Sequence, residues 1–135
     1  MNDKKINEMT DALIKEFLVK CDDRDDQVKM LSGGNVQKIL VGREIASEPS
    51  VLMSAYAVRG LDINSSYTIY RLLNEQKERG VAVIFVGEDL DVLIELCDRI
   101  MVIGSGRITG IVDGRTATKE EIEAIAEKQL QGQFE

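Results

Sequence analysis

The feature that most constrains the fold is an unbroken apolar stretch over residues 81–86, VAVIFV. Strands of parallel sheets are covered on both faces and therefore lack the alternation of half-exposed strands, so we predict a buried strand here. A second short apolar run lies at residues 51–53, and a helical pattern over residues 64–79 separates the two runs and ends at Gly80. Strand, helix and strand in this order predict an α/β fold with a mainly parallel sheet flanked by helices.

Further helices are predicted at both ends of the chain, together with a C-terminal hairpin. Apolar residues at spacings of three and four predict a first helix and a second one that ends before Pro49. Thr118 and Glu121 have the spacing of a capping box and begin the last helix. The additional predicted elements are helices over residues 3–20, 89–97 and 118 to about 130, a strand at 100–103, and a hairpin partner at 107–112.

Composition excludes several classes of function. The 135 residues carry a net charge of −7 and include no histidine. An acidic chain without a basic stripe disfavours nucleic acid and anionic membranes as direct partners, and His-based catalysis is excluded. Cys21 and Cys97 are far apart and match no ligand spacing, so we expect free thiols and no metal site. The longest apolar run is about half of a membrane span, so we expect no membrane insertion and a cytoplasmic location.

An acidic segment at residues 21–26 carries four aspartates. A calcium loop also needs a central glycine and a terminal glutamate, which are missing here. A solvated loop is therefore favoured over a cation site. We expect one domain over residues 1–135, helical over about 1–48 and α/β over about 49–135.

Residues 31–38, LSGGNVQK, place a serine and two glycines at the start of the second predicted helix. Small residues let the backbone approach a ligand, and the first turn of a helix has unpaired N–H groups that favour an anion such as a phosphate. An ordinary Ser-Gly-Gly turn that caps a helix explains the same residues equally well. The residues that follow decide between the two interpretations.

The run 31–38 resembles the signature motif of ABC-type ATPases, in the Asn-x-Gln-Lys form found in importers of simple sugars and nucleosides. Matches continue in order through residues 59–62 (RGLD), 88–91, 98–100 and 116–118. The resemblance implies part of a P-loop NTPase-like domain. It also implies that the signature residues contact the γ-phosphate of ATP held in trans by a partner domain. The residues assigned to nucleotide binding by the resemblance are Ser32, Gly33, Gly34, Asn35, Gln37, Asp62 in the D-loop and Glu88 at the switch position.

Partners follow from the same resemblance: another ABC nucleotide-binding domain and a transmembrane permease subunit, with a homodimer as a further option. A peripheral position at the inner face of the plasma membrane would accompany the permease. Asp62 has a second interpretation, because a carboxylate at that place also stabilises a helix N-terminus. Glu88 stands where the family has a histidine that contacts the γ-phosphate.

This sequence departs from the family in two respects. No Gly-x-x-x-x-Gly-Lys-[Ser/Thr] phosphate cradle is found in it. Ala55 and Tyr56 stand where the family has an aspartate that holds Mg²⁺ and a glutamate that positions water, and neither side chain can do this work. We expect no catalytic residue, with Mg²⁺ bound only through a partner, and a chain that acts as a half-site. The alternatives are an ATPase subunit completed by a second chain, and a truncated product without independent role.

The missing segment also affects the expected sheet. In the family a strand that ends in the phosphate cradle lies between the strands matching 81–86 and 100–103. We predict that these two strands close the gap by pairing directly, which gives the order 51–54, 81–86, 100–103, 107–112 with only the last strand antiparallel. A strand borrowed from a second copy is the less favoured closure.

Overall fold

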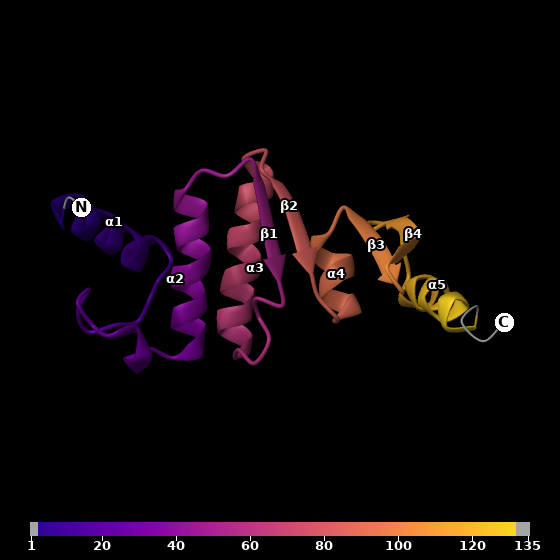
Figure 1. Ribbon diagram of the computed structural model, residues 1–135, viewed down its shortest axis with the longest axis horizontal. Coiled ribbons are helices and arrows are strands. Elements are labelled where there is room, and N and C mark those ends of the chain that lie inside the picture. Colours follow the sequence, from indigo (N-terminus) through magenta and orange to yellow (C-terminus); the bar gives the residue numbers. More distant parts are fainter. Residues whose placement is uncertain (1–2, 132–135) are drawn as a thin grey trace. The chain divides into compact units, whose positions relative to one another are not determined.

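A computed structural model describes residues 3–131 of the chain (Figure 1). The chain divides into two compact units, and the boundary between them in the sequence lies between Val86 and Gly87. The first unit contains α1 (Asp3–Glu16), a 3₁₀ turn η1 (Val28–Met30), α2 (Gly33–Ala46), β1 (Val51–Ala55), α3 (Ile63–Glu78) and β2 (Ala82–Val86). The second contains α4 (Leu90–Leu96), β3 (Arg99–Gly104), β4 (Arg107–Asp113) and α5 (Lys119–Gln131). Every predicted helix and strand is present, with bounds that differ by a few residues.

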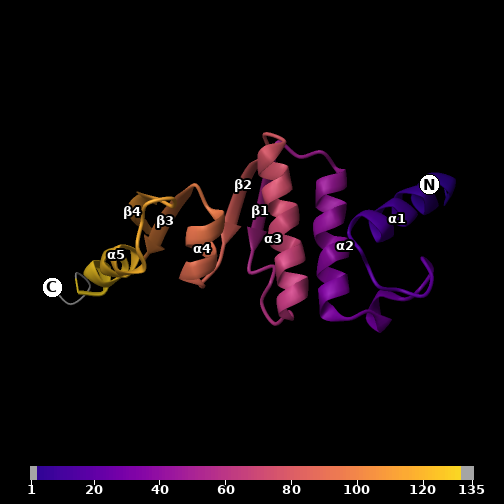
Figure 2. The ribbon, with the colours of Figure 1, turned by 180° about the vertical axis from the view of Figure 1, so that it is seen from behind.

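In the first unit β1 and β2 form a parallel pair joined through α3, which confirms the β-α-β prediction. Helix α3 covers one face of this pair, as the two opposite views show (Figures 1 and 2). Ile69, Leu72 and Leu73 of α3 are buried in one core with Leu52, while Val83 and Phe85 pack against it. Burial of these apolar side chains is the main source of stability for the unit.

The prediction that residues 81–86 are covered on both faces is wrong for this chain. Burial alternates along both strands, so that one face of the pair is covered and the other is open. The exposed large side chains of the open face are Val51, Met53, Ile84 and Val86. Parallel strands are apolar on both faces because both are normally covered, and here the cover is on one side only.

Helix α2 packs closely against the end of α1. A Cβ on Gly42 would lie 2.8 Å from the ring of Phe17, and Phe17 is only 2% exposed. The glycine that weakens the helix on propensity grounds therefore makes room for an aromatic ring. Helix α1 ends at Glu16, earlier than predicted, and the positive φ of Leu18 turns the chain away. Ile6 and Met9 remain exposed, so only the last turn of the predicted apolar stripe is packed.

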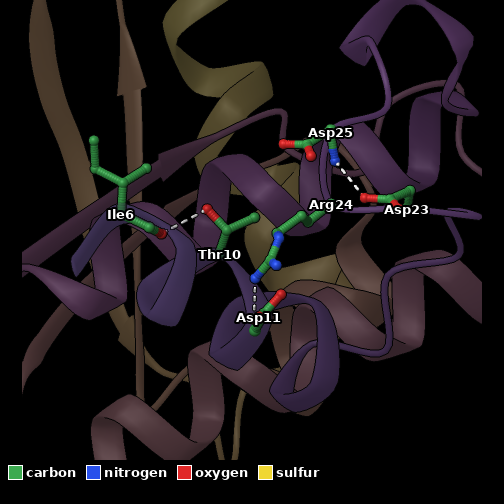
Figure 3. A network of polar contacts seen from close by, with 6 residues as sticks. All are labelled: Ile6, Thr10, Asp11, Asp23, Arg24 and Asp25. Carbon is green, nitrogen blue, oxygen red and sulfur yellow. Dashed lines mark hydrogen bonds and ion pairs between the residues drawn. The ribbon is translucent and has the colours of Figure 1, made fainter. Parts of the chain in front are cut away.

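The acidic segment after α1 is a loop, as predicted, and its aspartates bond within the chain (Figure 3). Arg24 reaches back to α1, where its guanidinium lies 2.5 Å from a carboxylate oxygen of Asp11. Asp23 accepts a hydrogen bond from the backbone N–H of Asp25 at 3.0 Å. No group of three or more His, Cys, Asp or Glu side chains within residues 3–131 could hold a metal ion.

The second unit consists of a β-hairpin, formed by β3 and β4, with α4 before it and α5 after it in the chain. Strands β3 and β4 are antiparallel and joined by Ser105 and Gly106, both at positive φ, which is the geometry of a tight hairpin turn. Helix α5 begins after Thr118, whose hydroxyl accepts the N–H of Glu121 at 3.2 Å, as the capping-box spacing predicts. The Lys119 ammonium on α5 lies 2.6 Å from the carboxylate of Asp91 on α4.

The predicted order of the sheet is wrong. The described strands form two separate two-stranded sheets, β1 with β2 and β3 with β4, and β2 does not pair with β3. A crossover between parallel strands needs about a dozen residues or more, and the segment 87–98 with its short helix α4 is at that lower limit. The hairpin of β3 and β4 needs only a two-residue turn, so it forms without that crossover.

Candidate functional site

The serine and glycines of the motif 31–38 lie where the sequence places them, at the N-terminus of α2. Ser32 is the N-cap residue, and its hydroxyl accepts a bond from the Asn35 N–H at 3.4 Å and from the Asn35 amide at 3.0 Å. Ser32 and Gly33 are exposed, whereas Gly34 is buried. Because the Ser32 oxygen accepts both bonds, its own proton stays available for a ligand oxygen.

Asn35 and Lys38 connect this helix to the chain segment that follows α1. The Asn35 side chain accepts the N–H of Lys20 at 3.0 Å and donates to the Lys20 carbonyl at 3.1 Å. The Lys38 ammonium donates to the carbonyl of Leu18 at 3.2 Å. Both side chains are buried, so these bonds satisfy polar groups that would otherwise lose their water. Asn35, for which the resemblance predicts a role in nucleotide binding, uses its side-chain amide to hold Lys20.

A test of this connection is the substitution Asn35→Ala. We expect the free energy of unfolding to fall by about 1–3 kcal/mol, because two backbone groups of Lys20 lose their partner in a part-buried place. Asn74→Ala is the matched control, since that amide bonds only to the exposed Glu78 carboxylate on the same helix. Urea unfolding followed by circular dichroism compares the two variants, and equal losses would contradict the role given to Asn35.

Asp62 lies beside the signature turn. It caps α3, where its carboxylate accepts the Ser65 N–H at 3.0 Å and the Ser65 hydroxyl at 2.6 Å. A Cβ on Gly34 would overlap the Ser65 hydroxyl and come within 3.7 Å of Asp62, so the N-termini of α2 and α3 are in close contact. Asp62 is thus a helix cap that lies next to the signature residues, and its D-loop role stays a prediction.

The hydrogen bond from the Ser65 hydroxyl, followed by that from the Ser65 N–H, lowers the pKa of Asp62 below its ordinary value. A depressed carboxyl pKa contributes stability that is fully present above the ordinary aspartate value and is lost as the pH falls through the folded-state pKa. We expect the wild-type chain to lose more unfolding free energy between pH 5 and about pH 3 than the Asp62→Asn variant. Urea titrations at these pH values measure the difference, and parallel pH profiles would contradict it.

Ala55 and Tyr56 lie at the carboxyl end of β1. Tyr56 has a φ of 53°, in the left-handed region, and its N–H donates to the carbonyl of Val86 at 3.0 Å. Its carbonyl accepts the N–H of Arg59 at 3.1 Å, which closes the turn after the strand. A methyl group and an exposed phenol are the side chains that this turn presents. They are not ligands for a hard cation, so the donor set does not fit Mg²⁺.

Gln37 and Glu88 are the remaining residues that the resemblance assigns to nucleotide binding. Gln37 is half-buried on α2. Glu88 is exposed and belongs to the second unit, just before Asp89, the N-cap of α4. The structure thus brings Ser32, Gly33, Gly34 and Asp62 together in the first unit. Sequence reasoning missed Lys38 and Ser65, although a serine three residues after Asp62 is a recognisable capping pattern.

No family model matches the chain. The ribose import ATP-binding protein RbsA of Lacticaseibacillus paracasei is 40% identical over 126 residues, which are 93% of this chain and 25% of that protein. RbsA of Bacillus subtilis is 39% identical over 123 residues, and the galactose/methyl galactoside import ATP-binding protein MglA of Clostridium perfringens is 34% identical over 127. The chain matches one segment of these ABC-type ATP-binding proteins over nearly its whole length. It spans about a quarter of the length of these relatives.

Solved structures agree on the ABC fold. A dimeric post-hydrolysis state of an ATP-binding cassette bound to ADP and Pi matches with a TM-score of 0.73 and 21% identity, over 87% of this chain and 50% of that one. A nucleotide-free ATP-binding cassette from an ABC transporter matches with a TM-score of 0.70 over 89% of this chain and 46% of that one. The fold of this chain therefore corresponds to about half of each of these two solved cassettes. No described helix of this chain is long and apolar enough to cross a membrane.

Proposed function

We propose that this chain is part of the ATP-binding subunit of an ABC importer for a simple sugar or nucleoside, and that it acts as the signature half of an ATP site. ATP and Mg²⁺ are held by another nucleotide-binding domain, and this chain adds the exposed Ser32 and Gly33 to the γ-phosphate. The same assembly includes a transmembrane permease and lies at the cytoplasmic face of the membrane. Relatives named as ribose and galactose import proteins support this proposal.

The observation that carries the proposal is the contrast between two places in the first unit, the start of α2 and the end of β1. At the start of α2, the Ser32 hydroxyl has a proton to donate, and the exposed Gly33 lies in the first helical turn, where N–H groups lack intrahelical partners. At the end of β1, Ala55 and Tyr56 offer no carboxylate to hold Mg²⁺ or to accept a proton from water. Such a chain can present a phosphate contact without hydrolysing ATP itself.

The isolated chain is expected to bind Mg-ATP weakly and to release no phosphate above a protein-free blank. Mixing it with a complete RbsA from Bacillus subtilis should change the ATP turnover of that protein, measured as phosphate release. Ser32→Arg should abolish the change, because a large cation replaces the phosphate contact, whereas Ser47→Arg at the other end of α2 should preserve it.

Turnover by the isolated chain would contradict the half-site proposal, as would an effect on RbsA that Ser32→Arg leaves intact. Restoring both carboxylates, by Ala55→Asp with Tyr56→Glu, should still give no turnover in the isolated chain. The groups that neutralise and orient the β- and γ-phosphates would remain absent from it.

A further inference from the structure

The side-chain amide of Asn35 connects the backbone of Lys20 with the hydroxyl of Ser32. Its oxygen accepts the Lys20 N–H at 3.0 Å, and its nitrogen donates to the Lys20 carbonyl at 3.1 Å and to the Ser32 hydroxyl at 3.0 Å. Asn35 is only 8% exposed. Three of the four hydrogen bonds that an amide can make are therefore formed within the chain, which leaves little capacity for a direct contact with a ligand.

The backbone of Lys20 determines which way round this amide lies. A backbone N–H can only donate and a carbonyl can only accept, so Lys20 requires the amide oxygen on one side and the amide nitrogen on the other. Turning the amide over would place two acceptors together at the Lys20 carbonyl and two donors together at its N–H, in a part-buried place where unmade bonds are costly. The amide nitrogen, and not the oxygen, is therefore directed at Ser32.

The position of Lys20 is in turn fixed by the residues before it. Phe17 and Val19 are buried in the core of the first unit. Leu18 lies between them at a φ of 52°, a left-handed conformation that a leucine keeps only where its surroundings impose it. The buried Lys38 ammonium holds the Leu18 carbonyl at 3.2 Å. These contacts set the path of the backbone that presents Lys20 to the amide.

The Ser32 hydroxyl is consequently left with one role. Its oxygen accepts the Asn35 amide at 3.0 Å and the Asn35 backbone N–H at 3.4 Å, and a hydroxyl oxygen has two acceptor positions. The group that remains is the O–H, which can only donate. A donor at the exposed start of α2 suits an oxygen that carries no proton, such as a phosphate oxygen. With the amide reversed, its oxygen would accept this proton and the hydroxyl would turn inward.

We propose that Asn35 is a positioning residue of the signature half-site: it does not touch the nucleotide, and it acts by holding the Ser32 hydroxyl as a proton donor toward the γ-phosphate. This role rests on the half-site function proposed above and adds to it a residue that acts through Ser32. It also ties the phosphate contact to the segment after α1, because Lys20 orients the amide and the amide orients the hydroxyl.

The orientation of the amide is tested on the isolated 135-residue chain, without any nucleotide. Nuclear magnetic resonance of the ¹⁵N-labelled protein measures the exchange of side-chain amide protons with water. We expect both Asn35 amide protons to exchange about tenfold more slowly than those of Asn74, whose amide donates to the exposed Glu78 carboxylate. In Ser32→Ala the proton directed at residue 32 should exchange several-fold faster, while the proton directed at the Lys20 carbonyl stays slow.

The positioning role is tested in the mixture with Bacillus subtilis RbsA, as phosphate release against the concentration of added chain. Ser32→Ala removes the hydroxyl and keeps Gly33, so it should reduce the change in turnover several-fold, and Asn35→Ala should cause a loss of the same size. The double variant should lose no more than Ser32→Ala, because a residue that acts only through Ser32 then has nothing to act on. Its urea midpoint should still fall below that of Ser32→Ala, since the Lys20 bonds are lost as well.

Lys38→Met is the matched control. It removes a buried bond to the same segment, at the Leu18 carbonyl, and leaves the bonds among Lys20, Asn35 and Ser32 in place. We expect this variant to lower the urea midpoint as Asn35→Ala does, and to keep the wild-type effect on RbsA turnover.

The positioning role alone is refuted if the Asn35 amide protons exchange as fast as those of Asn74, or if the losses of RbsA effect from Asn35→Ala and Ser32→Ala multiply in the double variant. It is also refuted if Lys38→Met costs as much of that effect as Asn35→Ala, which would make Asn35 a purely structural residue. A wild-type chain without any effect on RbsA would refute the half-site function, and the positioning role with it.

Discussion

Replacing Ile69 by alanine is expected to lower the free energy of unfolding of the first unit by about 2–5 kcal/mol. Ile69 is fully buried, at 0% exposure, in the layer between α3 and the β1–β2 pair. Removing three methyl or methylene groups there leaves a cavity that neighbouring side chains fill only in part. The measurement is urea unfolding followed by circular dichroism.

Ile63→Ala on the same helix is the matched control for this loss. Ile63 is 74% exposed, so the same chemical change removes little buried surface. We expect a change within about 0.5 kcal/mol for a surface position of this kind. Similar losses at positions 63 and 69 would show that α3 does not hold the core described above.

Replacing Gly114 by alanine is expected to destabilise the second unit by about 3 kcal/mol or more, at the upper end of overpacking effects. The added Cβ would overlap the carbonyl oxygen of Cys97 and lie 3.0 Å from its carbonyl carbon. Relief requires a backbone shift, and that shift would break the bond from the Gly114 N–H to the Asp98 carbonyl at 2.9 Å.

Gly110→Ala provides the control in the same hairpin. Its Cβ would approach the Ile125 side chain of α5 at 2.8 Å, and a side chain can rotate away at a smaller cost. Hydrogen exchange of the β3 and β4 amides, read by mass spectrometry, measures both variants. We expect much faster exchange for Gly114→Ala, and equal exchange in the two variants would contradict the backbone clash.

Local patterns in the sequence predicted the elements of this chain well. The capping signals at Ser32, Asp62 and Thr118 all correspond to helix starts, because each supplies a side-chain oxygen to a nearby N–H. Gly80, predicted as the end of the helix over residues 64–79, follows the C-cap Arg79 of α3 at a positive φ. These signals act within a few residues, which is the range over which sequence alone determines backbone geometry.

The burial of individual side chains was predicted less well, because it depends on which other element packs against each face of a helix. On α2 the apolar Leu40 is exposed, whereas the charged Lys38 is buried, which is the reverse of what hydrophobicity predicts. Gly34 and Gly42 lie on the buried face for steric reasons that hydrophobicity does not express. The pairing of β2 with β3 failed for a similar reason: apolar runs identify strands and leave their neighbours undetermined.

The order of the motifs in the sequence predicted where the candidate site lies. The contacts that each of its residues makes became clear only from the structure. Spacing indicated that Asn35 belongs to the signature, but only the structure shows its amide bonded to both backbone groups of Lys20. The contact of Asp62 with Ser65 beside Gly34 likewise joins two segments about thirty residues apart in sequence, a range at which no periodicity acts.

The two glycines of the signature turn are under different constraints. Gly34 has no room for a methyl group against Ser65, whereas a Cβ on Gly33 would meet only the Leu61 side chain, at an ordinary 3.8 Å. Gly34 would therefore be retained in any descendant that keeps α2 and α3 together, even one that has stopped handling nucleotide. Of the two glycines, Gly33 is the one that packing leaves free to vary, so its retention among descendants would reflect the proposed phosphate contact and not the architecture.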